Sequence, residues 1–118
     1  MTILTESALS SHPAVAESAA IGVPHSLKGE TIWCFVVLKP GVGADRGLAT
    51  TLRNVVADHL GRSFLPSKVV FVPELPKTRS AKIVRRAIRA AALEEDPGDL
   101  SSVENPDALE SIRRAVAI

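Results

Sequence analysis

The feature that most constrains the fold is an unbroken apolar run that begins after Thr31 and ends at Leu38. It reads Ile-Trp-Cys-Phe-Val-Val-Leu, with a glycine shortly before it and a Pro-Gly turn after it. A run of this length without polar alternation is typical of a strand that is buried on both faces, or nearly so. We therefore expect residues 31–38 to form a strand in which Cys34, Val36 and Leu38 are buried.

Two further strands and a helix are indicated by changes in the hydrophobic period. Residues 15–23 are β-branched and alanine-rich, and residues 68–72 form a short apolar run that Pro73 closes. Residues 45–60 instead carry leucine and valine at helical spacing, with polar residues outside. Gly61 follows at the position of a left-handed C-cap.

Three more helices are expected at other places in the chain. A short helix at residues 5–9 is stopped by the His-Pro pair that follows it. A last helix begins at Asn105-Pro106, which offers an N-cap followed by proline at the first helical position. The remaining helix is marked by apolar residues at helical spacing: Ile83, Val84, Ala87, Ile88 and Ala91.

After the short helix at residues 5–9, the order of the elements is strand, strand, helix, strand, helix, helix, which predicts a small α+β layer fold. A chain of 118 residues corresponds to about one domain. An acidic Pro-Gly segment at residues 94–98 interrupts the regular elements. We expect residues 1–93 to form the main domain, and residues 94–118 to form an acidic linker and a C-terminal helix that packs on it.

Composition excludes several classes of protein. One cysteine forms neither an internal disulfide nor a cysteine-based zinc site, and His12, His25 and His59 are too dispersed for a metal site. A net charge of +1 and an aromatic content of 3% argue against nucleic acid or a membrane as partners. No apolar run approaches the roughly 18 residues of a membrane span, and no signal pattern opens the chain. We expect a cytoplasmic protein.

The segment from Lys77 to Arg89 concentrates positive charge, since it holds six basic residues and no acidic one. Lys77, Arg79 and Lys82 lie at the start of the predicted helix, where the helix dipole disfavours positive charge. Free N–H groups at such a helix start, together with the Lys82 ammonium, would hold a phosphate or carboxylate. The alternative is a solvated basic face. Two nearby prolines favour the first interpretation, because they stiffen the loop.

The residues in and around this basic segment resemble those of a known family. Leu75–Arg86 is similar to the closing motif of AMP-forming acyl-CoA synthetases, which are adenylate-forming enzymes. That motif reads Leu-Pro-Lys-Thr-Arg-Ser-Gly-Lys-Ile followed by basic residues. The resemblance covers about residues 6–89, and the segment 98–102 resembles the short-chain branch that includes acetyl-CoA synthetase. Earlier matches follow in the family's order: Ser11-His12-Pro13-Ala14-Val15-Ala16-Glu17, Gly22-Val23-Pro24, Lys28-Gly29-Glu30, Phe35-Val36-Val37-Leu38-Lys39-Pro40-Gly41 and Leu60-Gly61.

The resemblance implies a fold and a role. The fold is a small mixed sheet of about three strands plus a short hairpin, flanked by helices. The role is that of a mobile C-terminal lid, which closes over an N-terminal AMP-binding domain that holds ATP and the carboxylic acid. Lys82 matches the lysine that assists acyl-adenylate formation, after which the lid rotates for thioester formation with CoA. ATP with magnesium and CoA are then substrates of the complete enzyme, and no cofactor is expected on this chain alone.

The resemblance also suggests contacts, with two departures. Ala57 stands where acetyl-CoA synthetases place an arginine near the CoA nucleotide, so nearby arginines are considered instead. Ala81 stands where the motif has glycine, which is a mild change if that residue keeps a negative φ. Besides Lys82, the candidate substrate or phosphate contacts are Lys77, Arg79, Ser80, Arg53 and Arg62.

Two further expectations concern the regulation and the activity of this chain. Lys82 is the suspected target of a protein acetyltransferase and of a deacetylase that reverses the modification. The sequence shows no Gly/Ser/Thr-rich phosphate loop and no acyl pocket before Thr5, so the chain alone is expected to be an inactive lid. The alternative is a stand-alone basic binding or regulatory module for a polyanion or a partner protein.

Overall fold

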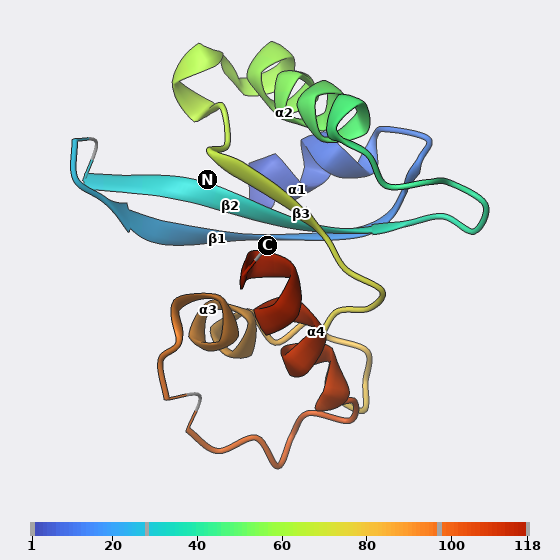
Figure 1. Ribbon diagram of the computed structural model, residues 1–118, viewed down its shortest axis with the longest axis vertical. Coiled ribbons are helices and arrows are strands. Elements are labelled where there is room, and N and C mark those ends of the chain that lie inside the picture. Colours follow the sequence, from blue (N-terminus) through green and yellow to red (C-terminus); the bar gives the residue numbers. More distant parts are fainter. Residues whose placement is uncertain (1, 28, 97, 118) are drawn as a thin grey trace. The chain divides into compact units, whose positions relative to one another are not determined.

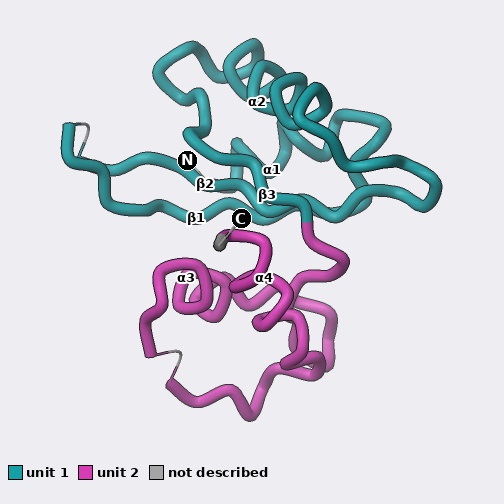
Figure 2. Tube along the Cα trace, viewed as in Figure 1, with its two compact units in different colours: residues 1–71 teal, residues 72–118 magenta. Residues whose placement is uncertain are grey.

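The computed structural model describes residues 2–27, 29–96 and 98–117. The chain forms two compact units, Met1–Phe71 and Val72–Ile118 (Figure 2). The sequence predicted a different division, into residues 1–93 and 94–118, and did not place a boundary after Phe71. That division stays a prediction.

The first unit is built on a three-stranded mixed sheet in the order β1-β2-β3 (Figure 1). β1 (Val15–His25) and β2 (Gly29–Leu38) are antiparallel, with Val15 opposite Leu38. β3 (Lys68–Phe71) runs parallel to β2 on its other side. The apolar run is therefore the central strand. Its consecutive residues Cys34, Phe35 and Val36 are all fully buried, so both faces of the strand are covered, which explains why it lacks polar alternation.

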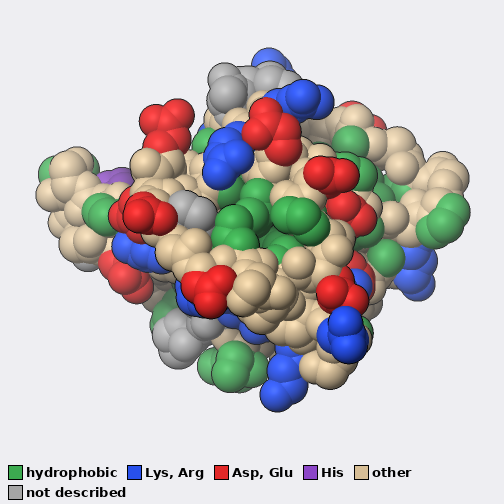
Figure 3. All heavy atoms as spheres, turned by 90° about the horizontal axis from the view of Figure 1, so that it is seen from below, with side chains coloured by type: hydrophobic (Ala, Val, Ile, Leu, Met, Phe, Trp, Pro, Cys, Tyr) green, Lys and Arg blue, Asp and Glu red, His purple; other side chains and the backbone are tan. Residues whose placement is uncertain are grey.

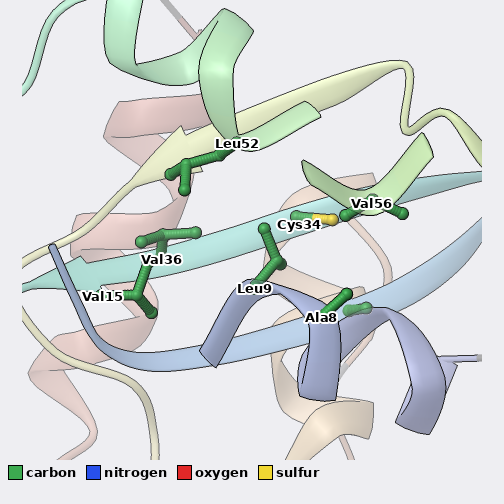
Figure 4. Close-up of a cluster of buried hydrophobic side chains, with 8 residues drawn as sticks. Ala8, Leu9, Val15, Cys34, Val36, Leu52 and Val56 are labelled. Atoms are coloured by element: carbon green, nitrogen blue, oxygen red, sulfur yellow. The ribbon is translucent and has the colours of Figure 1, made fainter. Parts of the chain in front are cut away.

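Two helices, α1 (Thr2–Ser10) and α2 (Arg46–Leu60), pack against the sheet and share one core with β2 (Figure 4). α2 supplies the crossover that a parallel β2–β3 pair requires, and the 3-10 turn η1 (Arg62–Phe64) completes it. The buried side chains of this core are Ala8, Leu9, Val15, Ala20, Cys34, Val36, Leu52 and Val56.

The burial predicted for the central strand is largely confirmed. Cys34 and Val36 are fully buried. Leu38 is only half-buried, contrary to the prediction, because it is the last residue of β2 and fewer neighbours surround the end of the strand.

Local hydrogen bonds define where α2 begins and ends. Asp45 is the N-cap, and its Oδ1 accepts a hydrogen bond from the Leu48 N–H at 2.7 Å. Gly61 closes the helix by donating its N–H to the Ala57 carbonyl at 2.8 Å. Its φ of 105° requires glycine, but its ψ of 157° is extended, so the predicted left-handed cap is wrong. The chain leaves the helix extended because η1 follows at once.

The second unit contains a short hairpin and two helices, α3 (Arg85–Leu93) and α4 (Asp107–Ala117), which pack against each other. Together with the mixed sheet, these elements confirm the predicted α+β class with about three strands and a short hairpin. Buried apolar side chains of this unit include Leu75, Ala87, Ile88, Val103, Leu109 and Ile112.

Candidate functional site

The basic segment forms a tight hairpin at residues 76–84, called the basic hairpin below. Lys77 and Ile83 face each other in an isolated antiparallel bridge. Two backbone hydrogen bonds of 2.9 Å flank this pair, donated by Thr78 N to Lys82 O and by Val84 N to Pro76 O. These bonds fix the two arms of the hairpin to each other and leave a loop of three residues at the tip.

The tip is a turn whose last residue has a left-handed backbone. Ala81 N donates to the Thr78 carbonyl at 2.9 Å, and Lys82 N donates to Thr78 Oγ1 at 3.2 Å. The φ of Ala81 is 68°, so the condition of a negative φ at this residue is not met. In three-residue hairpin loops the left-handed position usually holds glycine. Alanine adopts it here at a cost of about 1–2 kcal/mol, because its Cβ crowds the following carbonyl.

Lys82 lies next to this strained position. Its side chain is exposed and makes no hydrogen bond or ion pair with any residue in the described ranges. The prediction that the basic residues lie at a helix start is wrong, because α3 begins only at Arg85. The helix begins after the hairpin because the Val84 N–H is used there, as the donor to the Pro76 carbonyl.

A distant segment holds the base of the hairpin. The Asn105 side chain accepts a hydrogen bond from Lys77 N at 2.8 Å through Oδ1 and donates Nδ2 to the Leu75 carbonyl at 2.9 Å. The Glu104 N–H donates to the Lys77 carbonyl at 2.8 Å. Asn105 was expected to cap the last helix, but its side chain is turned to the hairpin instead. Its backbone carbonyl still accepts from Ala108 N at the start of α4.

Acidic groups offset part of the positive charge. Arg79 Nε lies 3.6 Å from Glu104 Oε1 in an exposed ion pair, and Arg89 Nε lies 3.8 Å from Glu95 Oε1. Arg86 differs, because its Nη2 donates at 2.8 Å to the neutral backbone carbonyl of Asp99. On the face shown in Figure 3, basic and acidic side chains are interspersed around a small group of hydrophobic ones. This face therefore carries no extended field of one sign.

A shallow hollow adjoins the hairpin tip. It is lined by hydroxyl groups and one ion pair, contributed by Thr78, Arg79, Ser80, Ser101, Ser102 and Glu104. The Thr78 and Ser80 hydroxyls lie 3.1 Å apart, and the Asp99 carboxyl accepts from Ser101 N at 2.9 Å. The hydrogen bonds from Ser101, assisted by the Arg86 charge, lower the pKa of Asp99.

The other predicted contacts belong to the first unit. Arg53 is half-buried on α2, and its Nε donates to the Pro66 carbonyl at 2.8 Å. Arg62 is exposed at the first residue of η1. Ala57, which the resemblance aligned with an arginine of acetyl-CoA synthetases, is 4% exposed and therefore buried in this chain. The structure thus gathers Lys77, Arg79, Ser80 and Lys82 on one hairpin. It leaves Arg53 on α2 and Arg62 on η1.

Cys34 is buried, and the three histidines make local hydrogen bonds. Burial raises the pKa of the Cys34 thiol to about 12, with a smaller contribution from the Glu6 carboxylate. His12 and His25 each accept a backbone N–H two residues ahead, and His59 pairs with the Val55 carbonyl. Within the described ranges, no three His, Cys, Asp or Glu side chains are placed to hold a metal ion. None of the helices in those ranges is long and apolar enough to span a membrane.

Sequence reasoning did not assign Thr78, Glu104 or Asn105 to the site. Thr78 shapes the turn through its hydroxyl, and a Thr-x-Ser pattern beside a proline is a usable turn signal. The contacts of Glu104 and Asn105 with the hairpin span more than 25 residues, and no local pattern announces them.

This chain is similar to known proteins of one family. The family described as AMP-binding enzyme C-terminal domain matches residues 4–82. The acetyl-coenzyme A synthetase of Methanothrix thermoacetophila is 48% identical over 107 residues, which are 91% of this chain and 16% of that protein. The 3-hydroxypropionyl-coenzyme A synthetase of Metallosphaera sedula is 44% identical over 111 residues, 94% of this chain and 17% of its own length.

Among solved structures, an acyl-CoA synthetase from Brucella canis superposes with a TM-score of 0.75 at 42% identity. The superposition covers 79% of this chain and 17% of that one. This chain therefore spans about a sixth of the length of the proteins that it resembles.

Proposed function

This chain belongs to the AMP-binding enzyme C-terminal domain family, and from that membership we propose that it is the mobile lid of an AMP-forming acyl-CoA ligase. The names of its relatives, acetyl- and 3-hydroxypropionyl-coenzyme A synthetase, favour a short acid as substrate. The observation that carries the proposal is the exposed Lys82 ammonium, which has no partner in the described ranges and projects from a hairpin that is hydrogen-bonded on both sides.

The proposed role of Lys82 is electrostatic. Acyl-adenylate formation brings a carboxylate and the α-phosphate of ATP together, and their like charges repel. A compact ammonium beside both anions offsets that repulsion as the new bond forms, and a positioned donor of this kind typically contributes about 2.7–4 kcal/mol to a transition state. Lysine suits the task because it acts as a point charge at the end of a flexible stem. In this scheme, ATP with its magnesium ion and the acid are substrates bound mainly by another domain.

The partner that this role requires is an N-terminal AMP-binding domain. A lid that swings away after the first step removes Lys82 and presents another surface for thioester formation with CoA. On that surface we propose Arg62 and Arg53 as contacts to the CoA nucleotide. Arg62 is the better placed of the two, since it is exposed while the Arg53 Nε is already bonded to a carbonyl.

Lys77, Arg79 and Ser80 are proposed as secondary anion contacts. Their backbone is fixed by the same hairpin that carries Lys82, so they move with it. The Arg79 guanidinium is 92% exposed, and its 3.6 Å pairing with Glu104 is weak enough in water to be exchanged for a phosphate.

Regulation by acetylation is proposed at Lys82. A protein acetyltransferase would reach the exposed ammonium, and acetylation would remove its charge while keeping its bulk. A deacetylase would restore it. Acetylation should therefore weaken adenylate formation and leave thioester formation largely unaffected.

The test is a chimera in which this chain replaces the matching segment of the Methanothrix thermoacetophila acetyl-coenzyme A synthetase. Lys82→Ala and Lys82→Gln are compared with Lys39→Ala, a substitution of an exposed lysine that follows β2. Adenylate formation is measured by acetate-dependent ATP–pyrophosphate exchange, and thioester formation is measured from supplied acetyl-adenylate and CoA.

We expect Lys82→Ala to slow adenylate formation about 100- to 1000-fold and to change thioester formation by less than a few fold. Lys39→Ala should change neither half-reaction. The 118-residue chain alone should show no ATP–pyrophosphate exchange. After treatment with an acetyltransferase, mass spectrometry should find acetyl groups at Lys82 and not at Lys77. Equal losses in both half-reactions would contradict a step-specific role for Lys82.

A further inference from the structure

The arm of the basic hairpin that precedes its tip is hydrogen-bonded on two sides. Thr78 N and Pro76 O point to the returning arm, where they meet Lys82 O and Val84 N. The N–H and C=O of Lys77 point the opposite way, as alternation along an extended chain requires. They meet Asn105 and Glu104, so the segment just before α4 lies beside the hairpin (Figure 1).

The Asn105 side chain acts there as a peptide group would in a neighbouring strand. Its carboxamide accepts from Lys77 N and donates to the Leu75 carbonyl, two groups separated by one residue. Only a carboxamide of this length supplies both a donor and an acceptor in one plane. Leu75 is fully buried, and Asn105 itself is half-buried, so water competes poorly for these bonds.

The bonds of Asn105 and Glu104 reach the hairpin from outside the part of the chain that matches the family. That match ends at Lys82, whereas the holding residues lie more than 20 residues further on. The tip of the hairpin carries the left-handed Ala81 immediately before Lys82. A strained tip keeps its geometry only while the surrounding structure holds it.

We infer that Asn105 is a positioning residue for Lys82: by pairing with the backbone of Leu75 and Lys77, it fixes the basic hairpin and thereby the origin of the lysine side chain. The expected effect on catalysis rests on the proposed function, whereas the positioning of the hairpin by Asn105 depends on this chain alone. Glu104 assists through its backbone N–H, which every substitution other than proline retains.

The first arm of the test uses the 118-residue chain and amide hydrogen exchange measured by NMR. Asn105→Ala and Asn105→Asp are compared with Asn54→Ala, which changes an exposed asparagine on α2. The reporting amides are those of Thr78, Ala81 and Val84, whose acceptors lie inside the hairpin. We expect Asn105→Ala to speed their exchange about tenfold, with the amides of α3 and α4 unchanged. Asn105→Asp keeps the acceptor for Lys77 N and should give an intermediate effect.

Two results would overturn the positioning role. One is unchanged exchange at Thr78, Ala81 and Val84 in Asn105→Ala, which would mean that the hairpin holds itself. The other is equal acceleration throughout the unit, α3 and α4 included, which would mean that Asn105 only stabilises the fold. Asn54→Ala should leave all of these amides as in the unmodified chain.

The second arm measures the half-reactions in the chimera described above. Asn105→Ala should lower the rate constant of adenylate formation about tenfold, leave the KM for ATP within a few fold, and spare thioester formation. Asn105→Asp should recover part of the rate. If Lys82→Ala has no selective effect in the same chimera, the proposed function fails, and the exchange experiment still decides whether Asn105 fixes the hairpin. A normal adenylation rate in Asn105→Ala beside a slow one in Lys82→Ala would contradict the catalytic consequence.

Discussion

Replacing Ala81 with glycine is expected to stabilise this protein. Ala81 has a φ of 68°, and its side chain is exposed on the hairpin tip. An L-residue pays about 1–2 kcal/mol for this conformation, whereas glycine adopts it freely. The Ala81 N–H to Thr78 hydrogen bond of 2.9 Å is a backbone bond, so glycine retains it.

The gain is smaller than the strain that is removed, because glycine also makes the unfolded chain more flexible. That entropic cost is about 0.4–1 kcal/mol. The methyl group that is lost is exposed and contributes little burial. The net stabilisation should therefore be about 0.5–1 kcal/mol, which raises the melting temperature by about 2–5 °C for a chain of this size.

Urea and thermal unfolding, followed by circular dichroism, measure this change. The matched control is Ala49→Gly, the same substitution inside α2. There the backbone is helical, and glycine should cost about 1 kcal/mol. The two variants should thus move the unfolding midpoint in opposite directions. If Ala81→Gly destabilises the chain as Ala49→Gly does, the left-handed strain at residue 81 is refuted.

Two further predictions concern the first unit. Asp45→Ala removes the side chain that accepts the Leu48 N–H, and it should lower the free energy of unfolding by about 1 kcal/mol in a urea titration. The control Asp58→Ala, at an exposed position within α2, should change that free energy by less than about 0.5 kcal/mol. The Cys34 thiol keeps its proton in the folded chain, since its pKa is raised from 9.0 to about 12. Unfolding above pH 9 therefore releases a proton. This group should leave the free energy of unfolding unchanged below pH 9 and lower it as the pH rises from 9 towards 12. Urea titrations at pH 8 and pH 10 should show this fall in the unmodified chain and a smaller one in Cys34→Ala; an equal fall in both would contradict it.

Much of the fold was predictable because its signals are local. The apolar run at residues 31–38 predicted a strand buried on both faces, or nearly so, and it is the central strand of the sheet. The leucine and valine spacing at residues 45–60 gave α2 almost to the residue. The parallel pairing of β3 with β2 then follows from the helix between them. Leu38 was misjudged because a hydrophobic pattern does not show where a strand runs out of neighbours.

The candidate site was only partly predictable. Lys82 and its exposed loop were identified from the motif, and the structure places Lys77, Arg79 and Ser80 on the same hairpin. The start of α3 was placed too early, since apolar residues at positions 83 and 84 continue the helical spacing while their backbone serves the hairpin.

By itself, the sequence determined which segments become strands and helices and which lysine stands exposed among basic residues. Those properties depend on side-chain periodicity and on turn residues within a few positions. Only the tertiary structure decided where the Asn105 carboxamide goes and which sign φ takes at Ala81. Asn105 would serve locally as a helix cap, but its side chain instead makes two hydrogen bonds to backbone groups of the fully buried Leu75 and the half-buried Lys77. That choice depends on bringing residues 28 and 30 positions apart together, which packing of the whole unit achieves and no local pattern encodes.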